Sequence, residues 1–282
     1  MARSDWKRPA LVPIEAGKRR IKMILSYVGT PYSGWAYQTN APTVVGVLQQ
    51  TIREMIGEEV EVIGSGRTDS GVHAAAQVCH FDIAHRNIKS GKFKPALNRL
   101  LPQSIRILHS EEVDGSFHAR YTTMGRTYRY YFKREGELLG FDEHRVAKLK
   151  AFPPLPLLDG YAKILVGTHD FTTFAAASDK SESKVRDIYE SYWKIEKDRF
   201  GAELLTYTIS GNAFLHKMIR SLVGSMIQFA GQKMGVEEFV EILEAKDRFR
   251  AGRTAQACGL YLYRITYDEE EYAWFEEEYG GH

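Results

Sequence analysis

The apolar residues of this chain form short segments with two different spacings. Cys79, Phe81 and Ile83 alternate with polar neighbours, as in a half-buried strand, whereas apolar residues between Val45 and Met55 recur at helical spacing. Such patterns predict strands at residues 21–27, 60–63, 78–83, 105–108, 125–133, 192–196, 204–209 and 260–267, and helices at 44–56, 159–166, 213–230 and 236–244. Because strands and helices are mixed and strands are often adjacent, we predict an α+β fold with helices packed on one face of a sheet.

Two of the predicted helices carry recognisable end residues. Thr43 can accept a backbone N–H at the start of the helix that ends before Gly57. Asn212 can do the same before the long segment AFLHKMIRSLVGSMIQFA, which Gly231 closes. This pattern predicts that the long helix starts directly after Asn212.

Charge is distributed unevenly along the chain. Residues 268–282 contain seven acidic residues and no Lys or Arg, and without those seven the chain has 38 basic and 29 acidic residues. Residues 1–22 contain seven basic and two acidic residues. The excess of basic residues in the rest of the chain suits a polyanionic partner such as nucleic acid, although charge blocks are also common on ordinary solvated surfaces.

Hydropathy and cysteine content exclude several classes of protein. No apolar run approaches the roughly 18 residues that a membrane span needs, and the first 22 residues lack the continuous apolar centre of a secretory signal. Cys79 and Cys258 are far apart and have no CxxC or nearby His spacing, so neither a disulfide framework nor a zinc site is indicated. We therefore expect a cytoplasmic location.

The segment with the most unusual composition is the predicted loop Gly64–Gln77, with the sequence GSGRTDSGVHAAAQ. Its glycines allow a sharp turn and the close approach of a large ligand, so we expect the loop to present Asp69 to that ligand. Arg67 lies two residues earlier, where an extended backbone would place it on the same side as Asp69 and favour the ionised carboxylate. The alternative is an ordinary turn in which Asp69 bonds its own backbone.

Two other interpretations of this loop are weak. The triplet Asp69-Ser70-Gly71 matches aspartic proteases, but these enzymes need two carboxylates and the chain has no second triplet of this kind. A phosphate-binding loop would need GxGxxG or GxxxxGK[ST], and neither pattern occurs.

Three cationic residues follow Asn212 within the predicted helix 213–230. His216 and Lys217 each lie three or four residues before Arg220, so the three can converge near the helix N-terminus and form an anion site. A solvated polar face is the alternative.

Arginine and aromatic residues are interleaved in two nearby segments, Phe117–Tyr121 and Gly125–Phe132. In a strand, Tyr128 and Tyr130 would share one face and Arg129 would lie on the other. Such a surface suits an unstacked base and its phosphates, whereas the alternative is a sheet of tyrosines in the core.

Together these segments resemble the tRNA pseudouridine synthase A family. Residues 66–74, GRTDSGVHA, are similar to the catalytic motif of that family, and further blocks agree in the same order. They are Gly34-Trp35, Gln77-Val78, His80-Phe81, Leu97-Asn98, Leu101-Pro102, Phe117-His118-Ala119-Arg120, Tyr128-Arg129-Tyr130, residues 170–174, Asn212-Ala213-Phe214, Met218-Ile219-Arg220 and residues 259–262. The similarity covers residues 21–267, with departures from the family at Val28, Ala36, Ala175 and Cys258.

The resemblance implies the pseudouridine synthase fold, in which a mixed, mostly antiparallel sheet is built of two ferredoxin-like halves. It implies an N-terminal half with the catalytic Asp loop at residues 21–116 and a C-terminal half at residues 117–267. A basic lead segment at residues 1–20 and an acidic tail at residues 268–282 lie outside the resemblance.

The resemblance also implies isomerisation of uridine to pseudouridine at positions thirty-eight, thirty-nine and forty in the anticodon stem-loop of tRNA. The enzyme would be a homodimer without cofactor or metal. Its catalytic residues would be Asp69, Arg67, Tyr128 and Arg220, with Asp69 acting on a flipped-out nucleotide as nucleophile or base. The residues expected to contact the substrate are Gly66, Thr68, His73, Arg120, Arg126, Arg129, His216 and Lys217.

Two other functions are compatible with these residues. The departures at Val28, Ala36 and Ala175 would suit an RNA-binding protein of the same fold without activity. An enzyme that hydrolyses nucleosides with an Asp nucleophile would break the same type of bond, but the sequence places no partner acid.

Overall fold

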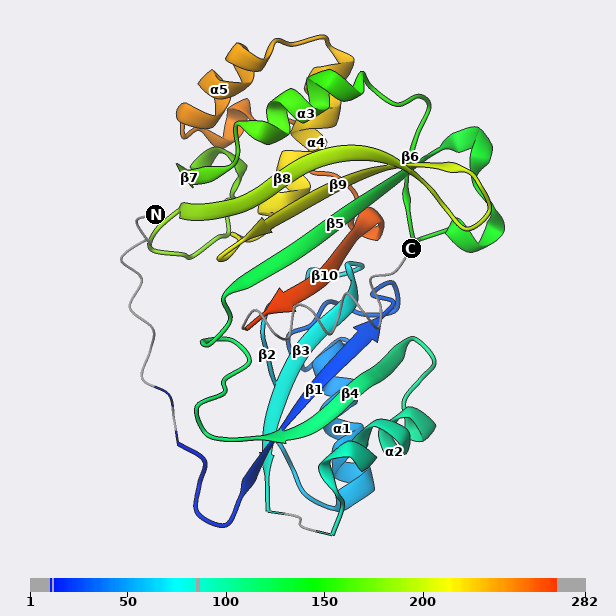
Figure 1. Ribbon diagram of the computed structural model, residues 1–282, viewed down its shortest axis with the longest axis vertical. Helices are drawn as coiled ribbons and strands as arrows, with labels where there is room; N and C mark the ends of the chain where they lie inside the picture. The colour runs from blue at the N-terminus through cyan, green and yellow to red at the C-terminus, as the bar shows by residue number, and fades with distance from the viewer. Residues whose placement is uncertain (1–10, 12, 85–86, 268–282) are drawn as a thin grey trace. The chain divides into compact units, whose positions relative to one another are not determined.

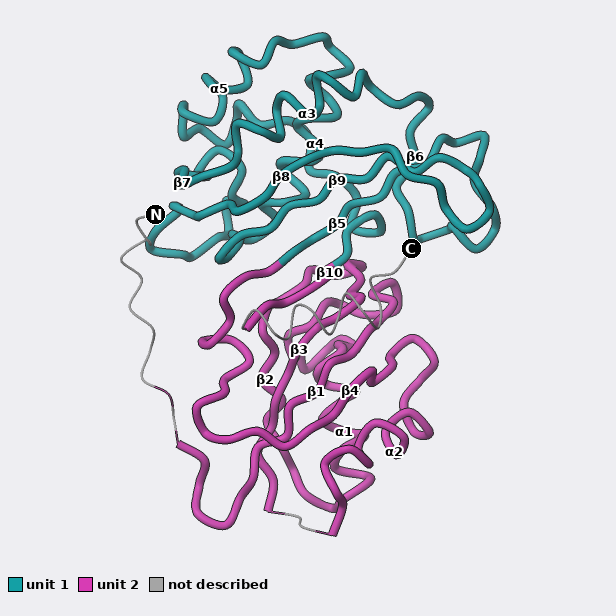
Figure 2. The backbone as a smooth tube through the Cα atoms, in the orientation of Figure 1, with its two compact units in different colours: residues 1–6, 127–261 teal, residues 7–126, 262–282 magenta. Residues whose placement is uncertain are grey.

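The computed structural model describes residue 11 and residues 13–84 and 87–267, which divide into two compact units (Figure 2). Unit 1 consists of the described residues 127–261, and unit 2 of the described residues up to 126 together with 262–267. Both divisions fall inside strands, because they cut β5 (Gly125–Arg134) and β10 (Leu260–Thr266). The predicted acidic tail and the first part of the basic lead lie outside the described residues.

Unit 2 follows the chain order strand, helix, two strands, helix, strand (Figure 1). These elements are β1 (Arg19–Tyr27), α1 (Val44–Ile56), β2 (Ile63–Gly64), β3 (His73–Ile83), α2 (Phe93–Leu100) and β4 (Ile105–Val113). β1 lies between β4 and β3 and is antiparallel to both, and β2 pairs with β3, also antiparallel. This is the element order of a ferredoxin-like half.

The helix α1 begins and ends where the sequence predicts. The Thr43 hydroxyl accepts from the backbone N of Gly46 at 3.2 Å, and Gly57 ends the helix in the left-handed region at φ 73°. Leu48 and Ile52 are fully buried on the inner face of the helix. The cap and the apolar stripe therefore specify this helix locally.

Two short segments of unit 2 differ from the predictions. The sequence pattern does not indicate α2, because the helix buries only Phe93 and Leu97, too few to show helical spacing. The strand predicted at residues 60–63 is reduced to β2. The backbone N of Val62 donates to Oε1 of Gln49 in α1 at 3.1 Å, so a helix side chain takes the hydrogen bond that a strand would make with its neighbour.

Unit 1 contains most of β5, the start of β10 and a second set of strands and helices. These are β6 (Ala147–Leu149), α3 (Leu155–Lys163), β7 (Gly167–Asp170), β8 (Val185–Lys197), β9 (Glu203–Gly211), α4 (Met218–Gly231) and α5 (Val236–Glu244). The strand order is β5-β9-β8-β7, with β8 antiparallel to β9 and β7, whereas β6 is parallel to β5. The pairing is therefore mixed and mostly antiparallel, as predicted, and α3 contacts β8, α4 and α5 (Figure 1).

The predicted start of the long helix is wrong, because α4 begins at Met218. Asn212 does not cap a helix. Its Oδ1 accepts from the backbone N of Asp187 at 3.1 Å and of Ala213 at 2.7 Å, which ties the end of β9 to β8. Lys217, directly before the helix, has a left-handed backbone at φ 58°, and this conformation cannot continue into a right-handed helix.

The prolines near the middle of the chain lie at the start of a helix that begins earlier than predicted. α3 begins at Leu155, before the predicted position 159, with Pro154 at the N-cap and Pro156 in the first turn. Proline is tolerated in the first turn because backbone N–H groups there have no acceptor within the helix, so the absence of one costs no hydrogen bond. The helix α5 has the bounds that the sequence predicts.

Unit 1 also buries a cation that the strand pattern does not reveal. Lys133 of β5 is fully buried, and its Nζ lies 2.7 Å from a carboxylate oxygen of Asp142 and 2.7 Å from one of Asp198. The lysine thus joins the segment after β5 to the turn between β8 and β9. None of the helices in the described part of the chain combines the length and hydrophobicity that crossing a membrane requires.

Candidate active site

The loop that carries Asp69 connects β2 to β3 in unit 2 and is shorter than predicted, because β3 already begins at His73. Its backbone bonds the segment that follows β1. The N of Trp35 donates to the carbonyl of Thr68 at 3.1 Å, and the N of Gly71 donates to the carbonyl of Tyr32 at 3.4 Å. Two loops far apart in the sequence are therefore joined on both sides of Asp69.

Glycines make this close approach possible. A Cβ added to Gly34 would lie 2.6 Å from the carbonyl oxygen of Thr68, and Gly34 has a left-handed backbone at φ 92°. A Cβ on Gly29 would lie 2.0 Å from the carbonyl oxygen of Val72. Any larger residue at either position would push the two loops apart.

Buried side chains also hold the same loop in place. The Thr68 hydroxyl bonds the hydroxyl of Tyr27 at 2.8 Å, and Nδ1 of His73 accepts from the backbone N of Gly29 at 3.1 Å. Thr68 and His73 are 7% and 1% exposed, so in this structure both act as supports of the loop. Nε2 of Gln77 donates to the carbonyl of Gly66 at 2.8 Å.

The two charged side chains of the loop remain accessible. Arg67 is exposed and Asp69 is partly exposed, whereas Thr68 between them is buried. The loop thus holds an anion and a cation at the surface on a backbone that is bonded on both sides. Such preorganised presentation is what a catalytic carboxylate requires.

The segment Phe117–Tyr121 forms a turn that two histidines hold. Nδ1 of His80 accepts from the backbone N of Ala119 at 3.2 Å, and Nδ1 of His118 accepts from the backbone N of Arg120 at 3.2 Å and of Tyr121 at 3.1 Å. Both rings must keep these nitrogens unprotonated in order to accept. The turn leaves Arg120 exposed, with its guanidinium 5.8 Å from the ring centroid of Tyr121.

Burial, reinforced by the Arg20 guanidinium, lowers the pKa of His80 to about 3, and burial also lowers the pKa of His118. Arg20 is 3% exposed and makes two bonds of 2.8 Å to the carboxylate of Asp82. His80 is a supporting residue to which the sequence analysis assigned no role. Its signal in the sequence was the block His80-Phe81.

The turn is bonded to the start of the Asp69 loop. The Thr123 hydroxyl donates to the carbonyl of Ala119 at 2.8 Å and lies 3.1 Å from the hydroxyl of Ser65. Nη2 of Arg126 donates to the carbonyl of Ser65 at 2.8 Å. Arg126, predicted to contact the substrate, thus also anchors the loop.

Unit 1 carries the other two predicted catalytic residues. Tyr128 of β5 is 7% exposed and packs edge-on against Phe214, with ring centroids 5.3 Å apart. Arg220 lies in the first turn of α4, where its Nε donates to the carbonyl of Ala255 at 2.8 Å and its own carbonyl accepts from the N of Ala255 at 2.9 Å. Tyr130 is fully buried on the same side of β5 as Tyr128, whereas Arg129 is half-buried.

The predicted convergence of His216, Lys217 and Arg220 on one helical face is wrong, because the first two residues precede α4. His216 is bound outside the helix: its backbone N donates to Oδ2 of Asp179 at 2.6 Å, and its Nδ1 lies 3.0 Å from the hydroxyl of Ser178. Although burial opposes ionisation of Asp179, hydrogen bonds from Lys184 and from the backbone N of His216 keep its pKa well below the ordinary value. A protein carboxylate therefore occupies part of the predicted anion site.

The candidate residues thus form two groups. Unit 2 holds Asp69 and Arg67 on a braced glycine loop, and unit 1 holds Tyr128 and Arg220 on β5 and α4. The pairing of Asp69 with Arg220 stays a prediction. A carboxylate, two guanidinium groups and a phenol are the groups needed for covalent or base chemistry on a nucleotide.

Comparison with known proteins supports an enzyme of this kind. The family model described as tRNA pseudouridine synthase matches residues 23–122 and 161–268. A protein called tRNA pseudouridine synthase A from Treponema pallidum is 40% identical over 260 residues, 90% of this chain and 91% of its own length. Proteins of the same name from Brevibacillus brevis and Acetivibrio thermocellus are 40% and 37% identical and are covered over their full length by 88% of this chain. The chain therefore belongs to the tRNA pseudouridine synthase family.

Proposed function

We propose that this protein isomerises uridine to pseudouridine in tRNA, with Asp69 as the catalytic carboxylate. The observation that carries the proposal is the loop around Asp69, in a chain that belongs to this family. Bonds to Tyr27, Gly29 and Trp35 brace the loop, while Asp69 itself stays partly exposed.

The reaction needs few parts. The bond between ribose C1′ and uracil N1 breaks, the detached ring rotates, and C5 forms a new bond to C1′. C5 loses a proton and N1 gains one, so no atom enters or leaves overall. The nucleotide must be flipped out of its stack, and the ionised Asp69 carboxylate acts on it as nucleophile or as the base that removes a ribose proton.

Three other residues complete the proposed catalytic set. Arg67, exposed two residues before Asp69, enters beside the flipped nucleotide and balances the charge of the carboxylate. Arg220 pairs with Asp69 and keeps it ionised and oriented. Tyr128 stacks on the uracil and assists the loss of the C5 proton.

Phosphate and base contacts come from the surrounding cations. Arg120, His216 and Lys217 are exposed, and Arg126 and Arg129 are half-buried. We assign these side chains to the RNA backbone and flanking bases. Gly66, Thr68 and His73 support this binding surface by holding the loop, as their bonds indicate.

We further propose that the target uridines are positions thirty-eight, thirty-nine and forty in the anticodon stem-loop. The enzyme would act on them as a homodimer in the cytoplasm, where tRNA is available. Mapping of pseudouridine in bulk tRNA from cells that lack and then regain this gene tests the positions. Sedimentation of the purified protein tests the dimer.

Release of tritium from tRNA labelled at C5 of uridine tests the reaction itself. Asp69→Asn should abolish release, because an amide cannot act as nucleophile or base at this position. Asp114→Asn is the matched control, since Asp114 is an exposed carboxylate of the same unit outside the loop. Full activity of Asp69→Asn would refute the assigned role, and tight tRNA binding by an inactive wild type would indicate an RNA-binding protein instead.

A further inference from the structure

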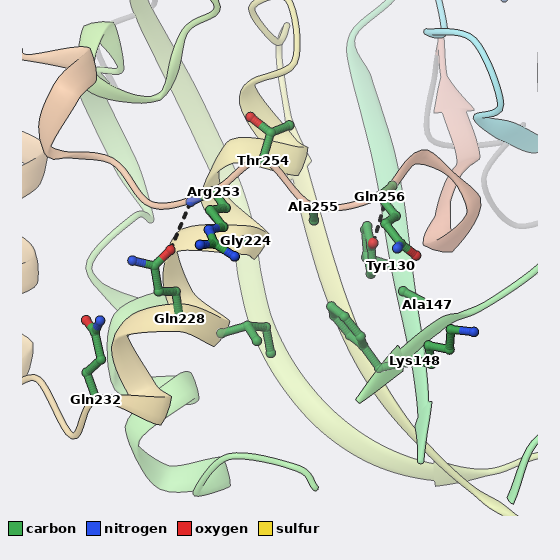
Figure 3. A pocket seen from close by; sticks show the side chains of 12 residues that line it. Tyr130, Ala147, Lys148, Gly224, Gln228, Gln232, Arg253, Thr254, Ala255 and Gln256 are labelled. Atoms are coloured by element: carbon green, nitrogen blue, oxygen red, sulfur yellow. Dashed lines mark hydrogen bonds between the residues drawn. The ribbon is translucent and has the colours of Figure 1, made fainter. Parts of the chain in front are cut away.

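Unit 1 contains a cavity of about 520 Å³ that the proposed reaction does not use (Figure 3). It is bounded by α4, β5, β6 and residues 253–256, and we call it the α4 pocket. Figure 3 shows Gln228 and Arg253 on one side of the cavity and Tyr130 and Lys148 on the other. The volume lies in the range of pockets that bind small molecules and is larger than a single phosphate needs.

The α4 pocket continues the surface that carries the proposed catalytic residues. On α4, Gly224 and Gln228 follow Arg220 at steps of four residues, which is about 6 Å and about 12 Å along the helix axis. On β5, Tyr130 lines the pocket two residues after Tyr128, on the same side of the strand. A short stretch of RNA strand covers such distances.

Backbone hydrogen bonds build the wall of the pocket. The N of Arg253 donates to Oε1 of Gln228 at 3.0 Å, and the N of Ala255 donates to the carbonyl of Arg220 at 2.9 Å. A Cβ on Gly224 would lie 1.8 Å from the carbonyl oxygen of Arg253, so only glycine lets this segment run against the helix. The segment that forms the wall is therefore fixed before any ligand arrives.

The chemistry of the lining favours a phosphate-bearing ligand. Lys148 and Arg253 are exposed cations at the rim, and among the described residues that line the cavity none is Asp or Glu. Oε1 of Gln228 accepts a bond from the backbone N of Arg253. The carboxamide N–H groups of Gln228 and Gln256 can donate to a ligand, and N–H donors beside cations suit phosphate oxygens.

The floor of the pocket is apolar. Tyr130 and Phe132 are 0% and 5% exposed, Ile227 is half-buried, and the Tyr130 hydroxyl is occupied by the carbonyl of Gln256 at 2.8 Å. An apolar floor below a rim of donors matches a nucleoside attached to its phosphate.

We propose that the α4 pocket is a subsite for a nucleotide of the RNA substrate near the reacting uridine, with Lys148 and Arg253 contacting phosphates from opposite sides of its rim. This inference rests on the proposed function. It adds a substrate contact outside the set of residues assigned to the reaction. Arg253 and Lys148 are exposed side chains whose removal leaves the backbone bonds of the wall in place.

The test compares the neutralising variants Lys148→Gln and Arg253→Gln with Lys150→Gln, which removes an exposed lysine two residues beyond Lys148 and outside the lining. Binding of tRNA is measured over a series of salt concentrations in the Asp69→Asn background, and KM and kcat are measured by tritium release. Each pocket variant should lower the slope of log affinity against log salt by about 0.7 and weaken binding about tenfold, with the effect mainly on KM. Lys150→Gln should change both much less.

Ile227→Trp provides a second test, because it fills the cavity without changing charge. It should raise KM for tRNA while the circular dichroism spectrum and oligomeric state stay as in the wild type. If the pocket variants match Lys150→Gln, or if Ile227→Trp leaves KM unchanged, the subsite is refuted. If these variants instead change the sedimentation of the protein, a second copy of the chain covers the pocket and the proposal is also wrong. A wild type without tritium release would contradict the proposed function, and the binding series would still decide whether the pocket contacts RNA.

Discussion

Replacement of His80 by asparagine should remove about 2 kcal/mol of the loss of stability that unit 2 suffers between about pH 7 and about pH 5. His80 accepts from the backbone N of Ala119 through Nδ1, and this bond requires an unprotonated nitrogen. The Oδ1 of asparagine occupies nearly the same position as Nδ1 and can accept the same bond without titrating. The variant therefore separates the acceptor role from the charge.

The magnitude follows from the pKa of His80. Burial and the Arg20 cation lower that pKa from 6.5 to about 3, and only Asp82 acts in the opposite direction. Above the unfolded value of 6.5, both states are neutral and the stabilisation is complete. As the pH falls from there toward 3, the unfolded chain binds a proton that the folded chain does not, so the free energy of unfolding decreases. Between about pH 7 and about pH 5 this decrease amounts to about 2 kcal/mol.

Urea unfolding of the wild type and His80→Asn at these two pH values measures the effect. The variant loses ring contacts with Phe117 and His118, so it should be less stable than the wild type at both values. The quantity of interest is the change between the two pH values, which should be about 2 kcal/mol smaller in the variant. His144→Asn, which removes an exposed histidine, is the control and should retain the wild-type change. An unchanged pH dependence in His80→Asn would refute the reasoning.

Three further substitutions test the supports of the two units. Gly34→Ala should destabilise the protein and lower tritium release, because it adds a Cβ 2.6 Å from the Thr68 carbonyl oxygen. Gly57→Ala is the control for backbone strain, because Gly57 also has a positive φ but has open space around it. Equal loss of activity in both variants would contradict the role of close approach. Lys133→Met should lower the free energy of unfolding by about 1.5–3 kcal/mol, because it removes the cation that both partly exposed carboxylates bond. A loss below about 1 kcal/mol in thermal or urea unfolding would show that the ion pairs are not needed. Thr43→Ala should cost about 1 kcal/mol in the same measurement, whereas Thr43→Ser should retain most of the stability because its hydroxyl can still accept from Gly46.

The parts of this protein that the sequence specifies are those whose partners lie nearby in the chain. Thr43 and Gly57 enclose α1 with bonds that span three or four residues, and α5 has its predicted bounds. The alternation in β5 correctly predicts that Tyr128 and Tyr130 share one face, and their burial shows that the alternative of tyrosines in the core applies to it. Such features depend on local backbone geometry and side-chain periodicity, which can be read along a single segment.

Other features are determined by residues that are distant in the sequence. The start of α4 is set by Asp187 and Asp179, which bond the segment before the helix, so the cap expected at Asn212 does not form. His80 and Lys133 become supporting residues only because Ala119, Asp142 and Asp198 are brought beside them.

The Asp69 loop combines both kinds of information. Its glycines and its Arg and Asp residues identify it in the sequence as a site. Its position is fixed by Tyr27, Gly29 and Trp35, which belong to a separate segment of the chain. A sequence can show which groups are available for chemistry, whereas burial and hydrogen bonding between distant segments decide which of them stay accessible and which are used to hold the others in place.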